Sequence, residues 1–121
     1  MAAPNLVNVA TITAKSVQAA LSTTLTTEIL ANASSSGKVF KVNNIIIANI
    51  DGSSAVDISV FITKSGGSPI AIASTISVPA DATLVVVDKD TSLYLEEGDN
   101  IEAVAGAASD AVITINYEEL S

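Results

Sequence analysis

The residue types best suited to chemistry in this chain are carboxylates that gather in its last third. Clustered carboxylates at turns can bind Ca²⁺, which takes six to eight oxygen ligands, and two carboxyls about 5–10 Å apart can serve as the acid and base of a glycosidase. The spacing does not match an EF-hand loop, because the sixth position counted from Asp88 is Leu93, where that loop has glycine. No Trp or Arg is present to line a sugar cleft. We interpret the cluster as solvated turn residues, with a structural cation as the alternative; its members are Asp88, Asp90, Glu96, Glu97 and Asp99.

Other reactive arrangements are weaker still. The chain has no Cys and no His, which removes thiolate chemistry, the commonest zinc ligands and the usual general base. Ser36-Gly37-Lys38-Val39 resembles the end of a phosphate-binding P-loop, but the upstream glycine is missing and Val39 stands where Ser or Thr is needed. We therefore expect a protein without enzymatic activity, catalytic residues, metal ligands or a cofactor.

The charge balance narrows the choice of partners. Thirteen acidic residues against five lysines give a formal net charge of −8. Binding to a phosphate backbone depends on clustered Lys and Arg, so we expect no nucleic-acid partner. No apolar run approaches the roughly 20 residues needed to span a bilayer, and the first residues do not resemble a signal peptide. We expect no membrane partner.

The elements that would position these residues are strands. Val, Ile and Thr make up 38 of the 121 residues, and apolar and polar residues alternate over most of the chain. Asp51-Gly52 is a hairpin signal, and Val85-Val86-Val87 is typical of a strand covered on both faces. The spacing predicts an all-β fold, an antiparallel, jelly-roll-like β-sandwich of seven to nine short strands. The clearest strand candidates are residues 38–50, 56–63, 70–78, 85–87, 93–95, 101–105 and 111–117.

We expect one sandwich domain over residues 16–121, preceded by residues 1–15 as an N-terminal arm or edge strand. The arm has apolar residues but no hairpin partner directly after it, so it either pairs with another subunit or forms the first strand of its own sandwich. Two tyrosines near acidic turns are either interface contacts or caps on the β core. The candidate interface residues are Leu6, Val7, Val9, Ile12, Tyr94 and Tyr117. The high apolar content of so small a chain predicts a homo-oligomer, which we expect to be a trimer.

Three stretches resemble a family of small virion structural proteins of tailed phages, most of all those of marine cyanophages. The most specific are SVPADATLVVVDK (77–89), SLYLEEGDNIEAVA (92–105) and INYEE (115–119), and the likeness continues through PNLVNVATIT (4–13) over nearly the whole chain. The resemblance implies a non-enzymatic β-sandwich protein located on the outside of the particle or at its neck.

On this basis we expect a capsid decoration, or cement, protein. It would be made in the host cytoplasm and located on the outer capsid surface of the virion, where its partner is the major capsid protein. A neck, collar or tail-fibre attachment subunit is the structural alternative. A carbohydrate-binding module is the alternative of another class. That last option is disfavoured by the scarcity of aromatic residues, which are Phe40, Phe61, Tyr94 and Tyr117.

Overall fold

The computed structural model describes residues 9–24 and 28–121. These residues form nine strands and one short 3₁₀ helix, η2 (Lys89–Thr91). The all-β fold that the sequence predicts is therefore confirmed. The strands are β1 (Ile12–Ala20), β2 (Glu28–Ala31), β3 (Val39–Asn49), β4 (Val56–Thr63), β5 (Ile70–Val78), β6 (Thr83–Val87), β7 (Leu93–Leu95), β8 (Asn100–Ala105) and β9 (Ala111–Leu120).

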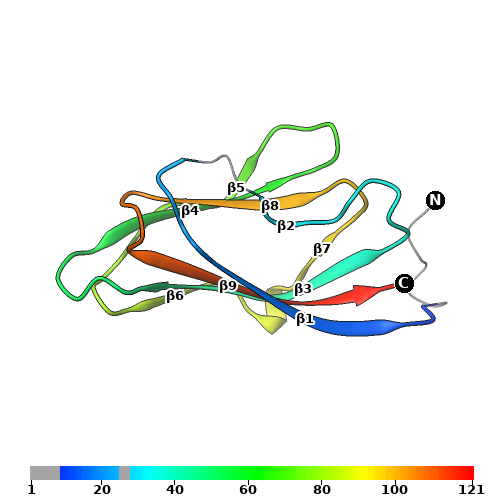
Figure 1. Ribbon diagram of the computed structural model, residues 1–121, viewed down its shortest axis with the longest axis horizontal. Coiled ribbons are helices and arrows are strands. Elements are labelled where there is room, and N and C mark those ends of the chain that lie inside the picture. The colour runs from blue at the N-terminus through cyan, green and yellow to red at the C-terminus, as the bar shows by residue number, and fades with distance from the viewer. Residues whose placement is uncertain (1–8, 25–27) are drawn as a thin grey trace.

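The strands form two antiparallel sheets packed face to face, which Figure 1 shows nearly edge-on. Sheet A has the order β1-β9-β3-β6, with β7 pairing to β3 as well, and sheet B has the order β2-β8-β4-β5. Four pairs therefore form in succession: β1 with β9, β2 with β8, β3 with β6, and β4 with β5. This is a long antiparallel ribbon wound into two sheets, which is the jelly-roll topology. The predicted jelly-roll-like sandwich is confirmed, with β7 as an additional strand.

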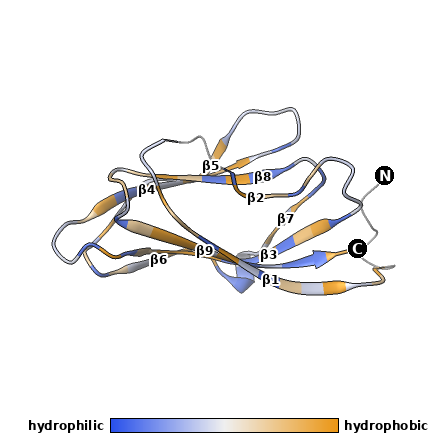
Figure 2. Cartoon of the chain, viewed as in Figure 1, coloured by the Kyte–Doolittle hydropathy of each residue, from blue (hydrophilic) through white to orange (hydrophobic). Residues whose placement is uncertain are grey.

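Alternation along each strand places the core between the sheets. On β9, Ile113, Ile115 and Tyr117 are buried, and the residues between them are only half-buried. Ile58 and Ile101 extend from sheet B into the same apolar cluster. Figure 2 shows β9 changing from hydrophobic to hydrophilic along its length, as its sequence passes from AVITI to NYEE. Burial of β-branched aliphatic side chains, each favourable by about 1.5–3 kcal/mol, is what holds the sheets together.

Two local expectations were wrong. Asp51-Gly52 does not close a hairpin, because β3 belongs to sheet A and β4 to sheet B. Here Asp51 accepts hydrogen bonds from the backbone N–H and the hydroxyl of Ser53, so the segment is a crossing loop. Val85 is 55% exposed, because β6 borders sheet A and its outer face is not covered by a second layer.

The boundary expected between residues 15 and 16 lies within β1, which runs unbroken from Ile12 to Ala20. All nine residues of β1 pair in register with β9, from Ile12 opposite Leu120 to Ala20 opposite Val112. Before β1, the N–H groups of Ala10 and Thr11 both donate to the carbonyl of Ser121. In the described part of the chain, the segment up to Lys15 is therefore joined to its own sandwich as an edge strand.

Candidate interaction surfaces

The five clustered carboxylates do not form a single site. Asp88 caps η2, accepting hydrogen bonds from the backbone N–H groups of Asp90 and Thr91. Glu96 to Asp99 lie in the turn between β7 and β8. Within the described residues, no group of three or more acidic side chains is arranged to hold a metal ion. The carboxylates therefore have to be considered one at a time.

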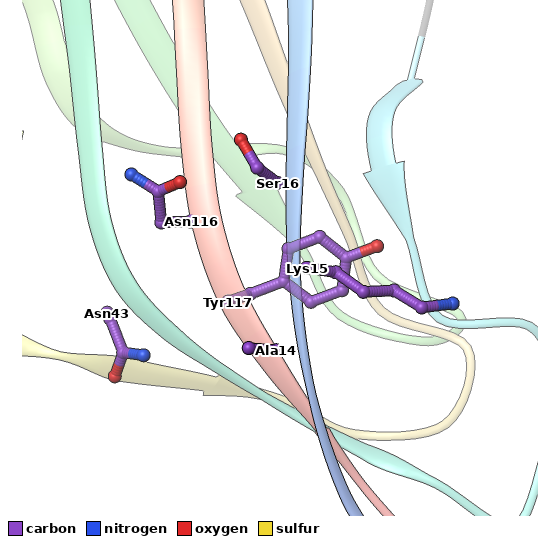
Figure 3. Close-up of a pocket in the computed structure, with 6 residues that line it drawn as sticks. All are labelled: Ala14, Lys15, Ser16, Asn43, Asn116 and Tyr117. Carbon is purple, nitrogen blue, oxygen red and sulfur yellow. The ribbon is translucent and has the colours of Figure 1, made fainter.

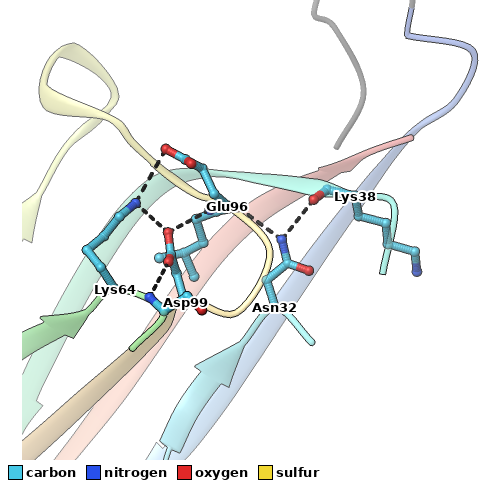
Figure 4. A network of polar contacts seen from close by, with 7 residues as sticks. Asn32, Lys38, Lys64, Glu96 and Asp99 are labelled. Carbon is cyan, nitrogen blue, oxygen red and sulfur yellow. Dashed lines mark hydrogen bonds and ion pairs between the residues drawn. The ribbon is translucent and has the colours of Figure 1, made fainter. Parts of the chain in front are cut away.

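Asp99 is a buried structural acid, only 2% exposed (Figure 4). Its carboxylate accepts hydrogen bonds from the backbone N–H groups of Ser65, at 3.0 Å, and Glu96, at 2.8 Å, and forms an ion pair with Lys64. Burial alone would raise the pKa of Asp99. The hydrogen bonds from Lys64 and the two backbone groups outweigh this effect and hold its pKa below the ordinary value. Asp99 thus ties the β4–β5 turn to the β7–β8 turn.

Asn32 connects a third loop at the same end of the sandwich (Figure 4). Its side-chain nitrogen donates to the carbonyls of Lys38, at 2.9 Å, and Leu95, at 3.1 Å, and its side-chain oxygen accepts a 2.6 Å bond from the Ser36 hydroxyl. The backbone N–H of Gly37 donates to Glu97 at 3.0 Å. The loop that resembled a P-loop therefore binds a carboxylate of the chain itself, so its glycine has a structural role in this turn.

Glu119 is the second buried acid, and two lysines share it. Lys15 on β1 lies 2.6 Å from one carboxylate oxygen, and Lys38 lies 2.8 Å from the other. Hydrogen bonds from Lys15 and Lys38 hold the pKa of Glu119 below its ordinary value, although burial opposes the shift. Nearby, the Tyr117 ring packs on Phe40 with ring centroids 5.1 Å apart. Burial raises the pKa of Tyr117.

The structure separates the predicted interface residues. Leu6 and Val7 lie outside the described residues, and Val9 is half-buried. Tyr117 is part of the core, so its position corresponds to a cap on the β core and not to an interface contact. Ile12, 62% exposed, and Tyr94, 44% exposed, are brought to the same outward face of sheet A. These two are available for contacts.

We call the part of this surface between Ala14 and Ala20 of β1 the outer A face. Its residues form four rows across the strands, defined by the pairing of β1, β9, β3 and β6 or β7. Only Glu118 and Lys41 are charged. The sequence did not reveal this face, because it depends on pairing between distant strands. The rows are Ala20-Val112-Ala48-Thr83, Gln18-Thr114-Ile46-Val85, Ser16-Asn116-Asn44 and Ala14-Glu118-Lys41-Tyr94.

A shallow hollow of about 370 Å³ opens where β1, β9 and β3 run side by side (Figure 3). It forms because β3 carries a bulge: Val42 pairs with Tyr117 and Asn44 with Asn116, which leaves Asn43 without a direct partner on β9. Tyr117 is the one aromatic residue among those that line the hollow, and its ring is packed on Phe40 in the core, so it offers no free stacking platform for a sugar. The lining residues are Ala14, Lys15, Ser16, Asn43, Asn116 and Tyr117.

A second surface, which carries no charge, follows β5, the edge strand of sheet B. Ile70 is 66% exposed, Ile72 and Ile76 are also exposed, and no residue of β5 carries a charge. The turn that leads into β5 lies at the top of Figure 1, while sheet A lies at the bottom. Charges and prolines are the usual protection of an edge strand. In their absence, β5 is suited to contact with another chain.

No known protein-family model matches the chain, and no curated protein matches it significantly. Among the described residues, no helix has the length and apolar character required to cross a membrane.

Proposed function

We propose that this chain is a non-enzymatic structural protein of a phage virion, a decoration protein that binds the outer capsid surface and stabilises the head. The observation that carries the proposal is the presence of two separate surfaces without net charge on one acidic sandwich, the outer A face and β5. Both expose large apolar side chains, among them Val85, Tyr94 and Ile70. The resemblance to small phage virion proteins supports the same function.

Two surfaces are what a cement protein needs, because it has to hold more than one neighbour at once. Each contact can be weak, since a subunit already bound through one surface meets the second partner at a high effective concentration. We assign β5 to the major capsid protein. Its free edge can accept a strand from a partner through backbone hydrogen bonds, with Ile70, Ile72 and Ile76 adding apolar contacts.

The net charge of −8 fits this assignment. Repulsion between acidic subunits favours their solubility before assembly. Contacts between uncharged surfaces bring few carboxylates out of water, so they avoid the desolvation that makes buried charges unfavourable.

The test is to add the purified protein to particles that lack it and to image them. We expect many copies spread over the head, and a higher temperature for particle disruption. Binding confined to the neck or tail would instead support the attachment-subunit alternative. Failure to bind any part of the particle would contradict the proposal.

A matched pair of variants tests the role of β5. Ile72→Asp places a charge on β5, and we expect it to abolish particle binding while the chain remains folded. Ala108→Asp makes the same change in charge in the exposed β8–β9 turn and should leave binding intact. Equal loss in both variants would show that charge alone, and not the β5 surface, controls binding.

A further inference from the structure

We propose that two copies of this chain pair through their outer A faces, about a two-fold axis that runs along the strands between β9 and β3. In this arrangement Tyr94 of each copy enters the hollow beside Ala14 of the other. The pairing concerns the free protein in solution and does not depend on the proposed role in the virion.

The distribution of charge favours a second copy as the occupant. Two chains of net charge −8 repel each other, and that repulsion is smallest where the contact itself carries no excess charge. The four rows of the outer A face carry one carboxylate, Glu118, and one ammonium group, Lys41, so their net charge is zero. Lys15, which also lines the hollow, is paired with Glu119. Sheet B exposes Asp57 on β4, and its β8 and β2 strands carry Glu102 and Glu28.

The register makes the outer A face complementary to itself. Glu118 and Lys41 are cross-strand neighbours in one row, on β9 and β3. Within the described chain, neither takes part in an ion pair, although both lie at the surface. A two-fold axis between β9 and β3 places Glu118 of each copy opposite Lys41 of the other. In a symmetric contact each such pair occurs twice.

The same axis brings apolar and uncharged rows together. Val112 comes to face Ala48 of the second copy, and Thr114 comes to face Ile46. Sheets that pack face to face keep their strand directions within about 30° of each other, as this axis requires. The rows of Val112 and Thr114 contain no charged residue, so they bury no charge in the contact.

Tyr94 of one copy fits into the hollow of the other copy. In the row of Lys41 and Glu118, Tyr94 lies at the β7 end and Ala14 at the β1 end. The axis exchanges these ends, so the exposed ring of Tyr94 comes to lie over the hollow of about 370 Å³ beside Ala14. The small side chains of Ala14 and Ser16 keep this hollow open. An aromatic anchor in a pocket is the usual centre of binding energy in a protein interface.

The size of the face is sufficient for a weak, specific pair. Four strands about 4.8 Å apart, each contributing about eight residues at 3.4 Å per residue, cover roughly 19 by 27 Å. Two such faces together bury roughly 1,000 Å², the lower limit for a specific interface. We therefore expect dissociation in the micromolar range. A symmetric contact closes at two copies, so this geometry favours a pair over the trimer expected from composition.

Sedimentation equilibrium of the full chain, without capsids, tests the pairing. We expect a monomer–dimer equilibrium, weakened about tenfold or more by Tyr94→Ala and preserved in Tyr94→Phe, which keeps the ring. Circular dichroism checks that both variants are folded. A monomer at all accessible concentrations, a three-copy species, or a Tyr94→Ala variant that pairs as well as the wild type would each overturn the proposal.

Charge reversal gives a second test with opposite expected signs. Glu118→Lys reduces the net charge from −8 to −6, so general repulsion predicts stronger pairing. The proposed contact predicts weaker pairing, because it places lysines opposite each other. Lys41→Glu should also weaken pairing, and the double variant, whose net charge is again −8, should restore it. Stronger pairing in Glu118→Lys, or no recovery in the double variant, would contradict the arrangement.

Because this test uses the isolated protein, its failure is distinguishable from failure of the decoration function. Ile72→Asp, which should abolish capsid binding, lies outside the outer A face and should pair normally. Loss of pairing in Ile72→Asp would assign self-association to β5 and overturn the proposal.

Discussion

Glu119 on the last strand forms an ion pair with Lys15 on the first strand, with 2.6 Å between the ammonium nitrogen and a carboxylate oxygen. The other carboxylate oxygen is bound by Lys38, which directly precedes β3. One buried acid therefore connects β1, β9 and the start of β3. Three of the five lysines of the chain are engaged in ion pairs with Glu119, Glu96 or Asp99.

Because of these buried carboxylates, we expect the protein to become less stable at acid pH. Glu119 has a pKa below its ordinary value of 4.5, and Asp99 has one below its ordinary value of 3.8. A carboxyl with a lowered pKa in the folded state contributes its full stabilisation above its unfolded pKa and loses it as the pH falls through the folded value. We expect the free energy of unfolding, measured with urea, to decrease as the pH falls below about 4.5.

Glu119→Gln tests the contribution of this acid. We expect it to lower the free energy of unfolding by about 1 kcal/mol at neutral pH, because the lysine partners are half-exposed. The free energy of unfolding of Glu119→Gln should also decrease less with falling pH than that of the wild type. Glu118→Gln is the control, measured where the chain is monomeric, since Glu118 has no ion pair within the described chain. Equal pH dependence in wild type and Glu119→Gln would contradict the prediction.

Asp99→Asn should lower the free energy of unfolding more than Glu96→Gln does. It removes a charge that is 2% exposed and bonded to Lys64 and to two backbone N–H groups, so we expect a loss of about 2 kcal/mol in the free energy of unfolding. Glu96→Gln affects a largely exposed partner of Lys64 at 3.5 Å and should change stability by less than about 0.5 kcal/mol. Urea unfolding of the two variants at neutral pH tests this prediction. Equal losses of unfolding free energy would show that the burial of Asp99 does not determine its contribution.

At the opposite end of the sandwich, Asn49 has a role similar to that of Asn32. Its side-chain nitrogen donates to the carbonyls of Ser54, Val78 and Pro79, and its oxygen accepts from the N–H of Asp51. We expect Asn49→Ala to lower the free energy of unfolding by about 2 kcal/mol, because three carbonyls, of which that of Val78 is buried, lose their donor. Asn43→Ala, at the bulge of β3, is the control and should lie within about 0.5 kcal/mol of wild type. Similar melting temperatures for the two variants would contradict this prediction.

Alternation of apolar residues was enough to predict the strands at 56–63 and 70–78, which match β4 and β5 to the residue. It could not predict which strands pair. Asp51-Gly52 has the local chemistry of a hairpin, yet the chain crosses there to the other sheet. The Asn49 side chain holds this crossing loop through hydrogen bonds with Asp51 and Ser54. Pairing of this kind depends on contacts between distant residues, which a local pattern does not contain.

The same limit applies to the candidate surfaces. Tyr94 and Ile12 were predicted as contacts from their residue types, and both are exposed. Tyr117 was predicted in the same way, although it alternates with Ile113 and Ile115 on the apolar side of its strand. Its position on the inward side of β9 decides its burial. The outer A face combines five strands that are distant in sequence, so its neutrality becomes visible only once the register is known. The lack of charge along residues 70–78 was visible in the sequence and marks β5.

Gly98 is the glycine whose replacement should be most revealing. It has φ +87°, and a Cβ added there would lie 2.7 Å from the Ser65 hydroxyl oxygen and 2.8 Å from the Ser65 Cβ. Gly66 has a similar φ of +75°, but an added Cβ would meet nothing within 4 Å. Comparing the two separates backbone strain from steric conflict.

We expect Gly66→Ala to lower the free energy of unfolding by about 1 kcal/mol, the cost of a positive φ for a residue with a Cβ. Gly98→Ala should cost about 1–2 kcal/mol more. To make room, Ser65 has to move, and its backbone N–H is one of the donors that hold Asp99. Ser65→Gly in the Gly98→Ala background removes the conflicting Cβ and should recover most of the excess, as a double-mutant cycle in urea would measure. If the two single variants were equally stable, backbone strain alone would account for the loss and the contact with Ser65 would have no part in it.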